Sequence, residues 1–232
     1  KHYTLALALA GLLGMNGGAH AAIVPVNIDN FDAGDQSIAD PDIDGVPVTD
    51  TVSGLPTASV VGGARTVSID VLAYNVNIGP TNALTVDTTS SLLDIINDSG
   101  EDSEAKVSWV IPANLIPAGA FGSFFRLSVL QSDGNPLSVQ FLLNNVSLGT
   151  FSVPGNTINQ DLLFTAGTAQ INAGGTLQMI INGEAGWDAD FDSIGLAYDD
   201  TLPTATPEPV SLALFGAGMI GLRCLRRRAR SV

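Results

Sequence analysis

The sequence predicts an all-β fold: a single antiparallel β-sandwich of jelly-roll type, flanked by an N-terminal signal helix and a short C-terminal membrane-anchor helix. Three observations lead to this prediction. Stretches of alternating apolar and polar residues recur through the middle of the chain, which is typical of strands with one buried face. Turn-forming residues separate these stretches at roughly the spacing of a sandwich. Each end of the chain carries one short apolar run of the kind found in targeting segments.

The alternation is clearest in five stretches: Arg65–Tyr74, Val107–Ile111, Phe125–Val129, Leu137–Leu143 and Leu177–Ile181. A final strand is expected at Ile194–Tyr198. Asn144-Asn145 lies between two apolar runs and predicts a tight hairpin, because Asn tolerates a positive φ. Residues 90–97 fit a helix or a strand equally well. We expect about nine or ten strands in all, within a domain over residues 22–201.

Residues 1–21 have the features of a secretory signal peptide. The apolar run from Leu5 to Met15 is too short to span a bilayer, and Ala19 and Ala21 provide the small-x-small pattern that precedes cleavage. We therefore expect export, with cleavage after Ala21. The alternative is a short buried helix.

The C-terminal end carries a linker and a short apolar segment. Residues 202–209 form a Pro/Thr-rich linker that ends in Pro207-Glu208-Pro209, and residues 210–232 combine an apolar run with an Arg-rich tail that includes Arg226, Arg227 and Arg228. A short apolar segment followed by arginines is a membrane-retention device oriented by its basic residues.

This order of features resembles the PEP-CTERM sorting signal of exported bacterial proteins. The resemblance implies a transient partner, an exosortase in the membrane. It further implies a precursor tethered to the inner membrane by its C-terminal segment alone, and then a product at the cell surface or in the exopolysaccharide matrix of a Gram-negative-type bacterium.

The middle of the chain is strongly acidic. Between Ala22 and Thr206 there are three basic residues and 22 acidic ones, a formal charge of −19. Such a domain repels phosphate backbones, which excludes nucleic-acid binding, and it attracts divalent cations or basic partners.

The middle also lacks histidine and cysteine, because His2, His20 and Cys224 lie in the two terminal segments. This excludes Ser-His-Asp and Cys-His catalysis, and zinc sites built from nitrogen or sulfur, within the domain. We predict that the protein is not an enzyme. Glu101, Glu104 and Glu184 are the carboxylates from which a glycoside hydrolase could be built, but Glu101 and Glu104 lie in a polar stretch typical of a solvated loop.

Two segments resemble the carbohydrate-binding-module-like jelly rolls of exported bacterial proteins. Phe141–Phe151 is similar to their hairpin, and Gly186-Trp187-Asp188 followed by Phe191–Leu196 is similar to their closing strand. The resemblance makes an exopolysaccharide or another glycan a candidate ligand. Trp187 is the candidate to stack on a sugar ring, and its alternative role is a hydrophobic plug over the end of the sandwich.

Two acidic clusters are candidate sites for a structural Ca²⁺ ion. Asp40, Asp42 and Asp44 with Gly45 repeat the start of an EF-hand loop, although Thr51 stands where the bidentate Glu would be. Asp188, Asp190 and Asp192 precede the last strand. If the first and last strands pair, Asp192 would share a cation with Asp29 or Asp32, as the related modules do in that region. The alternative for both clusters is a solvated acidic turn.

The sequence therefore predicts an exported structural or binding β-sandwich of the envelope or exopolysaccharide. A calcium-stabilised carbohydrate-binding module is the alternative, and a glycoside hydrolase is a more remote one.

Overall fold

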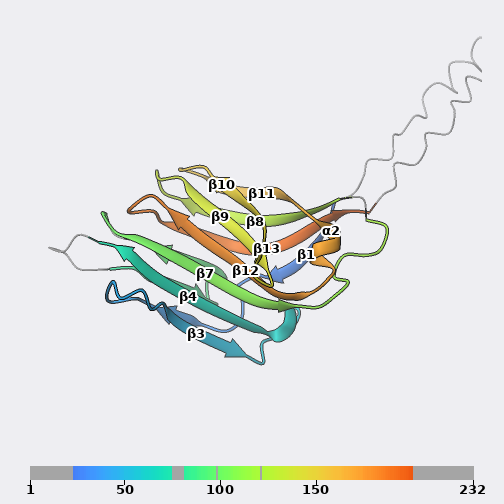
Figure 1. Cartoon of the computed structure of the whole chain (residues 1–232), viewed down its shortest axis with the longest axis horizontal. Helices are drawn as coiled ribbons and strands as arrows, with labels where there is room; N and C mark the ends of the chain where they lie inside the picture. Colours follow the sequence, from blue (N-terminus) through green and yellow to red (C-terminus); the bar gives the residue numbers. More distant parts are fainter. Residues whose placement is uncertain (1–22, 75–80, 98, 121, 201–232) are drawn as a thin grey trace, which may run out of the picture. The chain divides into compact units, whose positions relative to one another are not determined.

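Thirteen strands form two antiparallel sheets that pack face to face in the part of the chain that the structure describes (Figure 1). The computed structural model describes residues 23–74, 81–97, 99–120 and 122–200. The predicted signal peptide with Ala19 and Ala21, the linker and the sorting signal lie outside the described residues. None of the described helices is long and apolar enough to span a membrane.

Sheet A, as we name the first layer, has the strand order β11-β8-β13-β6-β5-β2, and β1 pairs with the second half of β13. Its members are β1 (Ile23–Asp29), β2 (Gln36–Ile38), β5 (Ala83–Asp87), β6 (Leu92–Ile96), β8 (Ser123–Ser132), β11 (Ile158–Ala166) and β13 (Ala189–Asp199).

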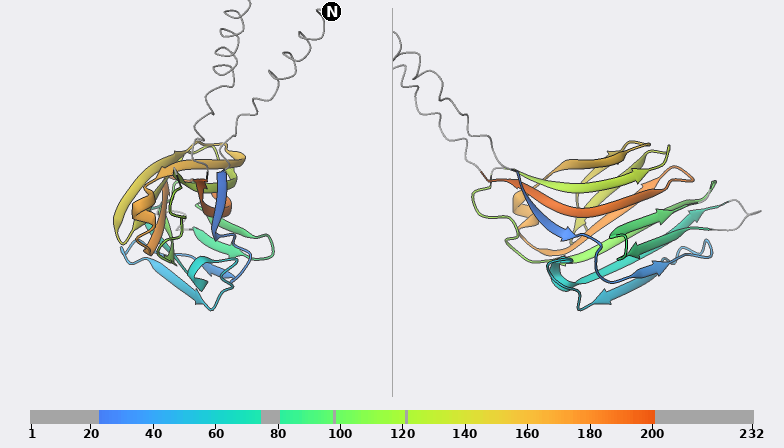
Figure 2. Two further views of the ribbon diagram at one scale, coloured as in Figure 1. Left: turned by 90° about the vertical axis from the view of Figure 1, so that its right-hand side faces the viewer. Right: turned by 180° about the vertical axis from the view of Figure 1, so that it is seen from behind.

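Sheet B has the order β10-β9-β12-β7-β4-β3. Its members are β3 (Val48–Ser53), β4 (Ala64–Ala73), β7 (Asp102–Ile111), β9 (Leu137–Leu143), β10 (Val146–Val153) and β12 (Gly175–Gly183). A 3-10 turn η1 (Val61–Gly63) and one helical turn α2 (Thr168–Ile171) complete the described structure. Figure 2 shows the two layers from one end and from behind.

The predicted all-β sandwich is confirmed, and each of the five alternating stretches lies in a strand. The ambiguous residues 90–97 contain strand β6. The expected number of strands was too low. The missed strands are short, as β2 is, or lie at an edge, as β11 does, where most side chains are exposed and no apolar alternation develops.

The core between the sheets is apolar and closely packed. Val67 and Ile69 of β4 and Phe125 of β8 are fully buried, and Phe125 stacks on Phe141 of β9 with ring centroids 3.9 Å apart. Trp109 is in the core, as its alternation with Val107 and Ile111 predicted. The core and all thirteen strands lie within Ile23–Asp200, so this unit has a complete core of its own.

The hairpin between β9 and β10 turns at Asn144 and Asn145, as predicted. Both residues have a positive φ, 51° and 64°, and the flanking Leu143 and Val146 are cross-strand partners. Two consecutive left-handed residues match the twist of the strands that they join.

One ionic group lies inside this apolar core and connects the two sheets. Arg65 of β4 and Asp29 of β1 are both fully buried, and Arg65 Nη1 lies 3.0 Å from Asp29 Oδ2. Arg65 Nε donates to Gln36 Oε1 (2.8 Å), and Nη2 donates to the carbonyl oxygens of Ala33 (3.0 Å) and Gly34. Trp109 Nε1 also donates to Asp29 Oδ2, at 2.8 Å.

We predict that Arg65→Met destabilises the unit Ile23–Asp200 by about 3–5 kcal/mol, because it leaves the Asp29 carboxylate buried without its counter-charge. Urea denaturation measures this loss. Arg126→Met is the matched control: its partner Asp161 lies 2.8 Å away, but both side chains are exposed, so its cost should stay within about 1 kcal/mol. Equal costs for the two variants would contradict the prediction.

Candidate functional site

The outer face of sheet B carries a row of polar side chains that crosses five strands. Cross-strand pairing places Asp70 of β4 opposite Glu104 of β7, Glu104 opposite Asn182 of β12, Asn182 opposite Ser138 of β9, and Ser138 opposite Ser152 of β10. Their sequence neighbours face the core, since side chains alternate along a strand. The row is therefore a continuous line of oxygen and amide groups on the outer face of sheet B.

A depression of about 290 Å³ lies at the β9–β10–β12 end of this row. Its lining residues come from these three strands and the segments next to them: Pro136, Leu137, Ser138, Ser152, Asn182, Gly183 and Glu184. The hydroxyl of Ser138 donates to the Asn182 carbonyl oxygen at 3.1 Å. The side chains of Asn182, Ser152 and Glu184 form no hydrogen bond with another described residue, so they can bind a ligand.

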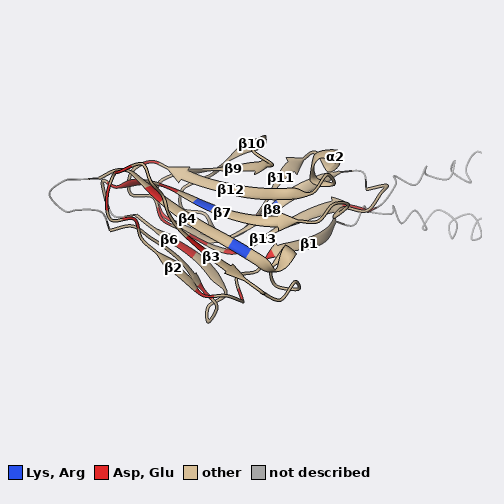
Figure 3. Cartoon of the chain, turned by 60° about the horizontal axis from the view of Figure 1, so that its bottom comes forward, with Lys and Arg blue, Asp and Glu red and all other residues tan. Residues whose placement is uncertain are grey.

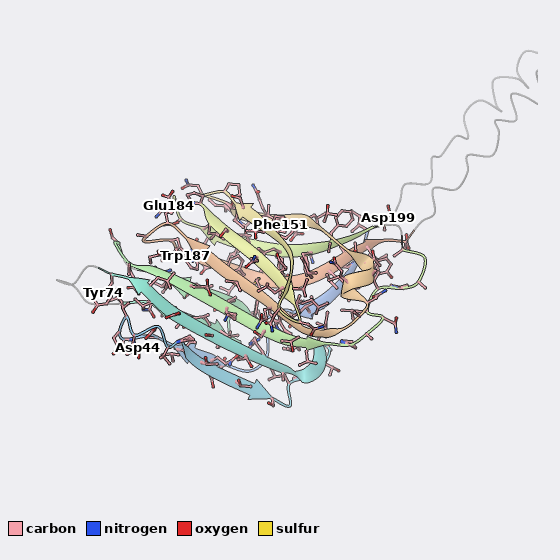
Figure 4. The ribbon with its side chains drawn as sticks, in the orientation of Figure 1. Asp44, Tyr74, Phe151, Glu184, Trp187 and Asp199 are labelled. Carbon is pink, nitrogen blue, oxygen red and sulfur yellow. The ribbon has the colours of Figure 1, made fainter. Side chains whose placement is uncertain are left out.

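Trp187, labelled in Figure 4, lies in the core beneath the lining residue Gly183 instead of on a surface. It is 0% exposed, and a Cβ atom added to Gly183 in the lining would lie 2.6 Å from its Cγ. Its indole N–H donates to the Ser103 carbonyl oxygen at 3.3 Å. The prediction that Trp187 stacks on a sugar ring is therefore wrong, and the alternative, a hydrophobic plug, is right. A Gly-Trp-Asp segment gives no local sign that its indole points inward.

The pairing of the first and last strands is confirmed, but Asp29 is buried and Asp192 is exposed, so the structure does not bring these two carboxylates together. Asp29 stands opposite Ile194 in the β1–β13 ladder, and its carboxylate faces the core. There it accepts hydrogen bonds from Arg65, Trp109 and the Phe31 N–H, whereas Asp192 is exposed. Asp32 is exposed as well and accepts from Asn30 Nδ2 at 3.0 Å.

In the loop that contains Asp40, Asp42 and Asp44, two of the carboxylates accept hydrogen bonds from backbone N–H groups. Asp40 is buried, and its Oδ2 accepts from the Val71 N–H at 2.9 Å, while Asp44 Oδ1 accepts from the Val46 N–H at 2.8 Å. No group of three or more carboxylates that could hold a metal ion is present within the described ranges of residues 23–200. Calcium binding at this loop stays a prediction.

The cluster around Asp190 gains a member that the sequence did not indicate. Asp94 of β6 is the cross-strand partner of Asp190 on the outer face of sheet A. Its partial burial, its hydrogen bond to Asp190, and the charges of Asp190 and Asp188 raise the pKa of Asp94 to about 7. Asp188 Oδ1 accepts from the Asn97 N–H at 2.7 Å, which fixes Asp188 beside the end of β6. Asp94 could be found only from the β6–β13 register.

Glu101 is buried, which corrects the expectation of a solvated loop. It is 2% exposed, and its two carboxylate oxygens accept from the Thr81 N–H (2.7 Å) and from Asn82 Nδ2. The same Asn82 amide donates to the Asp40 carbonyl oxygen at 2.9 Å. Glu101 therefore anchors two loops to the start of β7, and both of its oxygens are occupied by these bonds.

Comparison with known proteins gives no family: no family model and no curated protein matches this chain. Among solved structures, a family 4 carbohydrate-binding module is 13% identical, with a TM-score of 0.36, and the match covers 57% of this chain and 87% of that one. A family 29 module complexed with mannohexaose is 11% identical over 77% of this chain and 93% of that one, with a TM-score of 0.33.

The family 11 module of a cellulosomal cellulase of Clostridium thermocellum is 10% identical over 78% of this chain and 98% of that one, with a TM-score of 0.30. Scores this low carry no argument about function. The strand pairing within the two sheets shows the sandwich.

The pKa of Asp94 predicts a pH-dependent stability. The folded domain keeps the Asp94 proton up to a pH of about 7, whereas the unfolded chain loses it above its ordinary value of 3.8. Stability should therefore fall as the pH rises between these two values and remain lower above them. Asp94→Asn removes this loss of stability. After allowance for solvent screening, we expect a gain of about 1 kcal/mol at about pH 8. For a domain of this size, that gain raises the melting temperature by roughly 2–4 °C.

The control is Asp87→Asn at the end of the adjoining strand β5. Hydrogen bonds from the Ser90 hydroxyl and the Thr89 N–H lower the pKa of Asp87, so this variant should be less stable than the parent at the same pH. Thermal melts across the pH range compare the two. A drop in stability for Asp94→Asn at about pH 8 would contradict the account.

Proposed function

We propose that the unit Ile23–Asp200 is a non-catalytic module that binds a neutral, hydroxyl-rich polymer, a glycan of the cell surface or extracellular matrix. The observation that carries this proposal is the depression on sheet B. Its free amide, hydroxyl and carboxylate groups, from Asn182, Ser152 and Glu184, can hydrogen-bond to hydroxyl groups. Its floor, formed by Gly183 and Leu137, is apolar and can pack against the C–H groups of a carbohydrate.

Electrostatics favours a neutral polymer over an anionic one. The domain carries a formal charge of −19, so polyanions are repelled over most of its surface. The three strands that form the depression, β9, β10 and β12, contain no charged residue. A neutral chain that approaches this side therefore meets Glu184 as the one charged residue of the lining.

The chemistry of the domain favours binding over catalysis. The unit contains no histidine or cysteine, and Glu101, a carboxylate considered for a hydrolase, serves as a structural anchor. Asp94, whose pKa is raised to about 7, lies on sheet A and not at the depression.

Export and sorting by an exosortase complete the proposal. In it, residues 1–21 direct secretion, and residues 202–232, with Pro207, Glu208 and Pro209 and the arginines after them, hold the precursor in the membrane until processing. The module would then act in the exopolysaccharide outside the cell. The support for this part is the order of features in the sequence.

Affinity electrophoresis in gels that contain neutral polysaccharides, followed by calorimetry on any polymer that retards the domain, tests the binding proposal. We expect retardation by at least one glucan, xylan or mannan. Asn182→Ala should weaken the association at least about tenfold, which corresponds to ~1.4 kcal/mol of lost hydrogen bonding.

The matched control is Gln131→Ala, which removes another amide, on sheet A opposite Asp190. It should bind like the parent. No retardation by any neutral polymer would refute the proposal. An equal loss of affinity in the two variants would show that the depression is not the binding site.

A further inference from the structure

Strand β11 is a free edge of sheet A. It pairs with β8 on one side, and no described strand pairs with its other side. At the opposite edge of the same sheet, β2 has only three residues, from Gln36 to Ile38, whereas β11 has nine. A strand of this length offers a row of unpaired backbone N–H and C=O groups.

This edge has few of the features that usually prevent edge-to-edge pairing. Strand β11 has no proline and no lysine, and its exposed side chains include Ile158 (63% exposed) and Leu163 (45% exposed). Next to it, Phe164 of β11 stacks on Phe151 of β10 across the seam between the two sheets, with ring centroids 4.5 Å apart. Both phenylalanines are only partly buried.

Charge decides which partner such an edge can accept. From Gly134 to Gly183 the sequence has a single charged residue, Asp161, and Arg126 of β8 neutralises it at 2.8 Å. Figure 3 shows the acidic residues gathered mainly at the end of the sandwich far from α2, with the region of β9 to β12 almost free of them. Two copies of this acidic domain can therefore meet at β11 with most of their carboxylates far from the contact, and Asp161, the carboxylate on β11 itself, is paired with Arg126.

We propose that β11 is a homodimer interface, at which β11 of a second copy pairs antiparallel about a two-fold axis and continues sheet A into the partner. Such a contact is isologous, so it closes on itself and leaves no free β11 edge. The partly exposed Phe164 and the exposed Leu163 would be covered in the dimer. The proposal does not depend on polymer binding at sheet B.

The net charge predicts how this association responds to salt. Both copies are acidic, so their long-range repulsion opposes the dimer when the Debye length is about 30 Å, near 0.01 M salt. Screening to a Debye length of about 8 Å, near 0.15 M salt, should strengthen it. An interface held by ion pairs would show the opposite trend.

Sedimentation velocity of the unit Ile23–Asp200 over a concentration series at these two salt concentrations tests the proposal. We expect a monomer–dimer equilibrium whose association constant rises with salt. Leu163→Lys adds to this edge the kind of charged side chain that protects natural edge strands from pairing, and it should lower the association constant more than about tenfold at both salt concentrations.

Val110→Lys is the matched control. Val110 is 58% exposed on β7 of sheet B, and its replacement changes the net charge by the same amount without touching the β11 edge. This variant should dimerise at least as well as the parent. A parent that stays monomeric at both salt concentrations would overturn the proposal, and so would equal losses in the two variants.

Hydrogen exchange provides a readout that does not depend on how well Leu163→Lys folds. In the parent, backbone amides between Ile158 and Ala166 should exchange more slowly at the higher protein concentration, whereas those of β3, an edge strand of sheet B, should not change. Protection confined to β3, or no protection at either edge, would contradict β11 as the interface.

Discussion

The buried pair of Asp29 and Arg65 is the interaction on which the rest of the sandwich depends. Asp29 belongs to sheet A and Arg65 to sheet B, so the ion pair crosses the core and connects the layers. A guanidinium removed from water is tolerated only when its N–H groups are satisfied. The chain meets this demand by folding the segment between β1 and β2 over Arg65, which places the Ala33 and Gly34 carbonyls and the Gln36 side chain around it.

The candidate binding face is a consequence of the same core. Gly183 lies in the depression and Trp187 lies directly under it, so the core indole sets the depth of the floor. The indole is in turn held by the Ser103 carbonyl, and the Trp187 carbonyl oxygen accepts from Asn97 Nδ2 at 2.8 Å. Trp187 therefore shapes the site from below, and the groups that reach a ligand are polar.

Local patterns in the sequence predicted the parts of the fold that local physics determines. The alternation in Leu137–Leu143 and the two asparagines after it predicted β9 and its hairpin, because burial and turn conformation are encoded by adjacent residues. Edge strand β11 was missed, since a strand with both faces largely in water need not alternate.

The site was less predictable, because its residues come together only through pairings between distant segments. Nothing near Asp29 shows that Arg65 will neutralise it, and nothing near Asp190 shows that Asp94 will stand opposite. The acidic composition suggested cation sites, yet Asp29, Asp40 and Glu101 are engaged by hydrogen bonds within the chain. The depression itself depends on the register of β9, β10 and β12, which no local pattern specifies.

The central claim is that the module binds its ligand through the uncharged strands of sheet B. A residue-resolved NMR titration of the unit Ile23–Asp200 with short oligosaccharides of a polymer that it retains tests this most directly. The account predicts that the amide shifts change at Ser138, Ser152 and Asn182 and leave Asp94 and Asp190 unmoved. Shifts confined to sheet A, or none at saturating ligand, would contradict it.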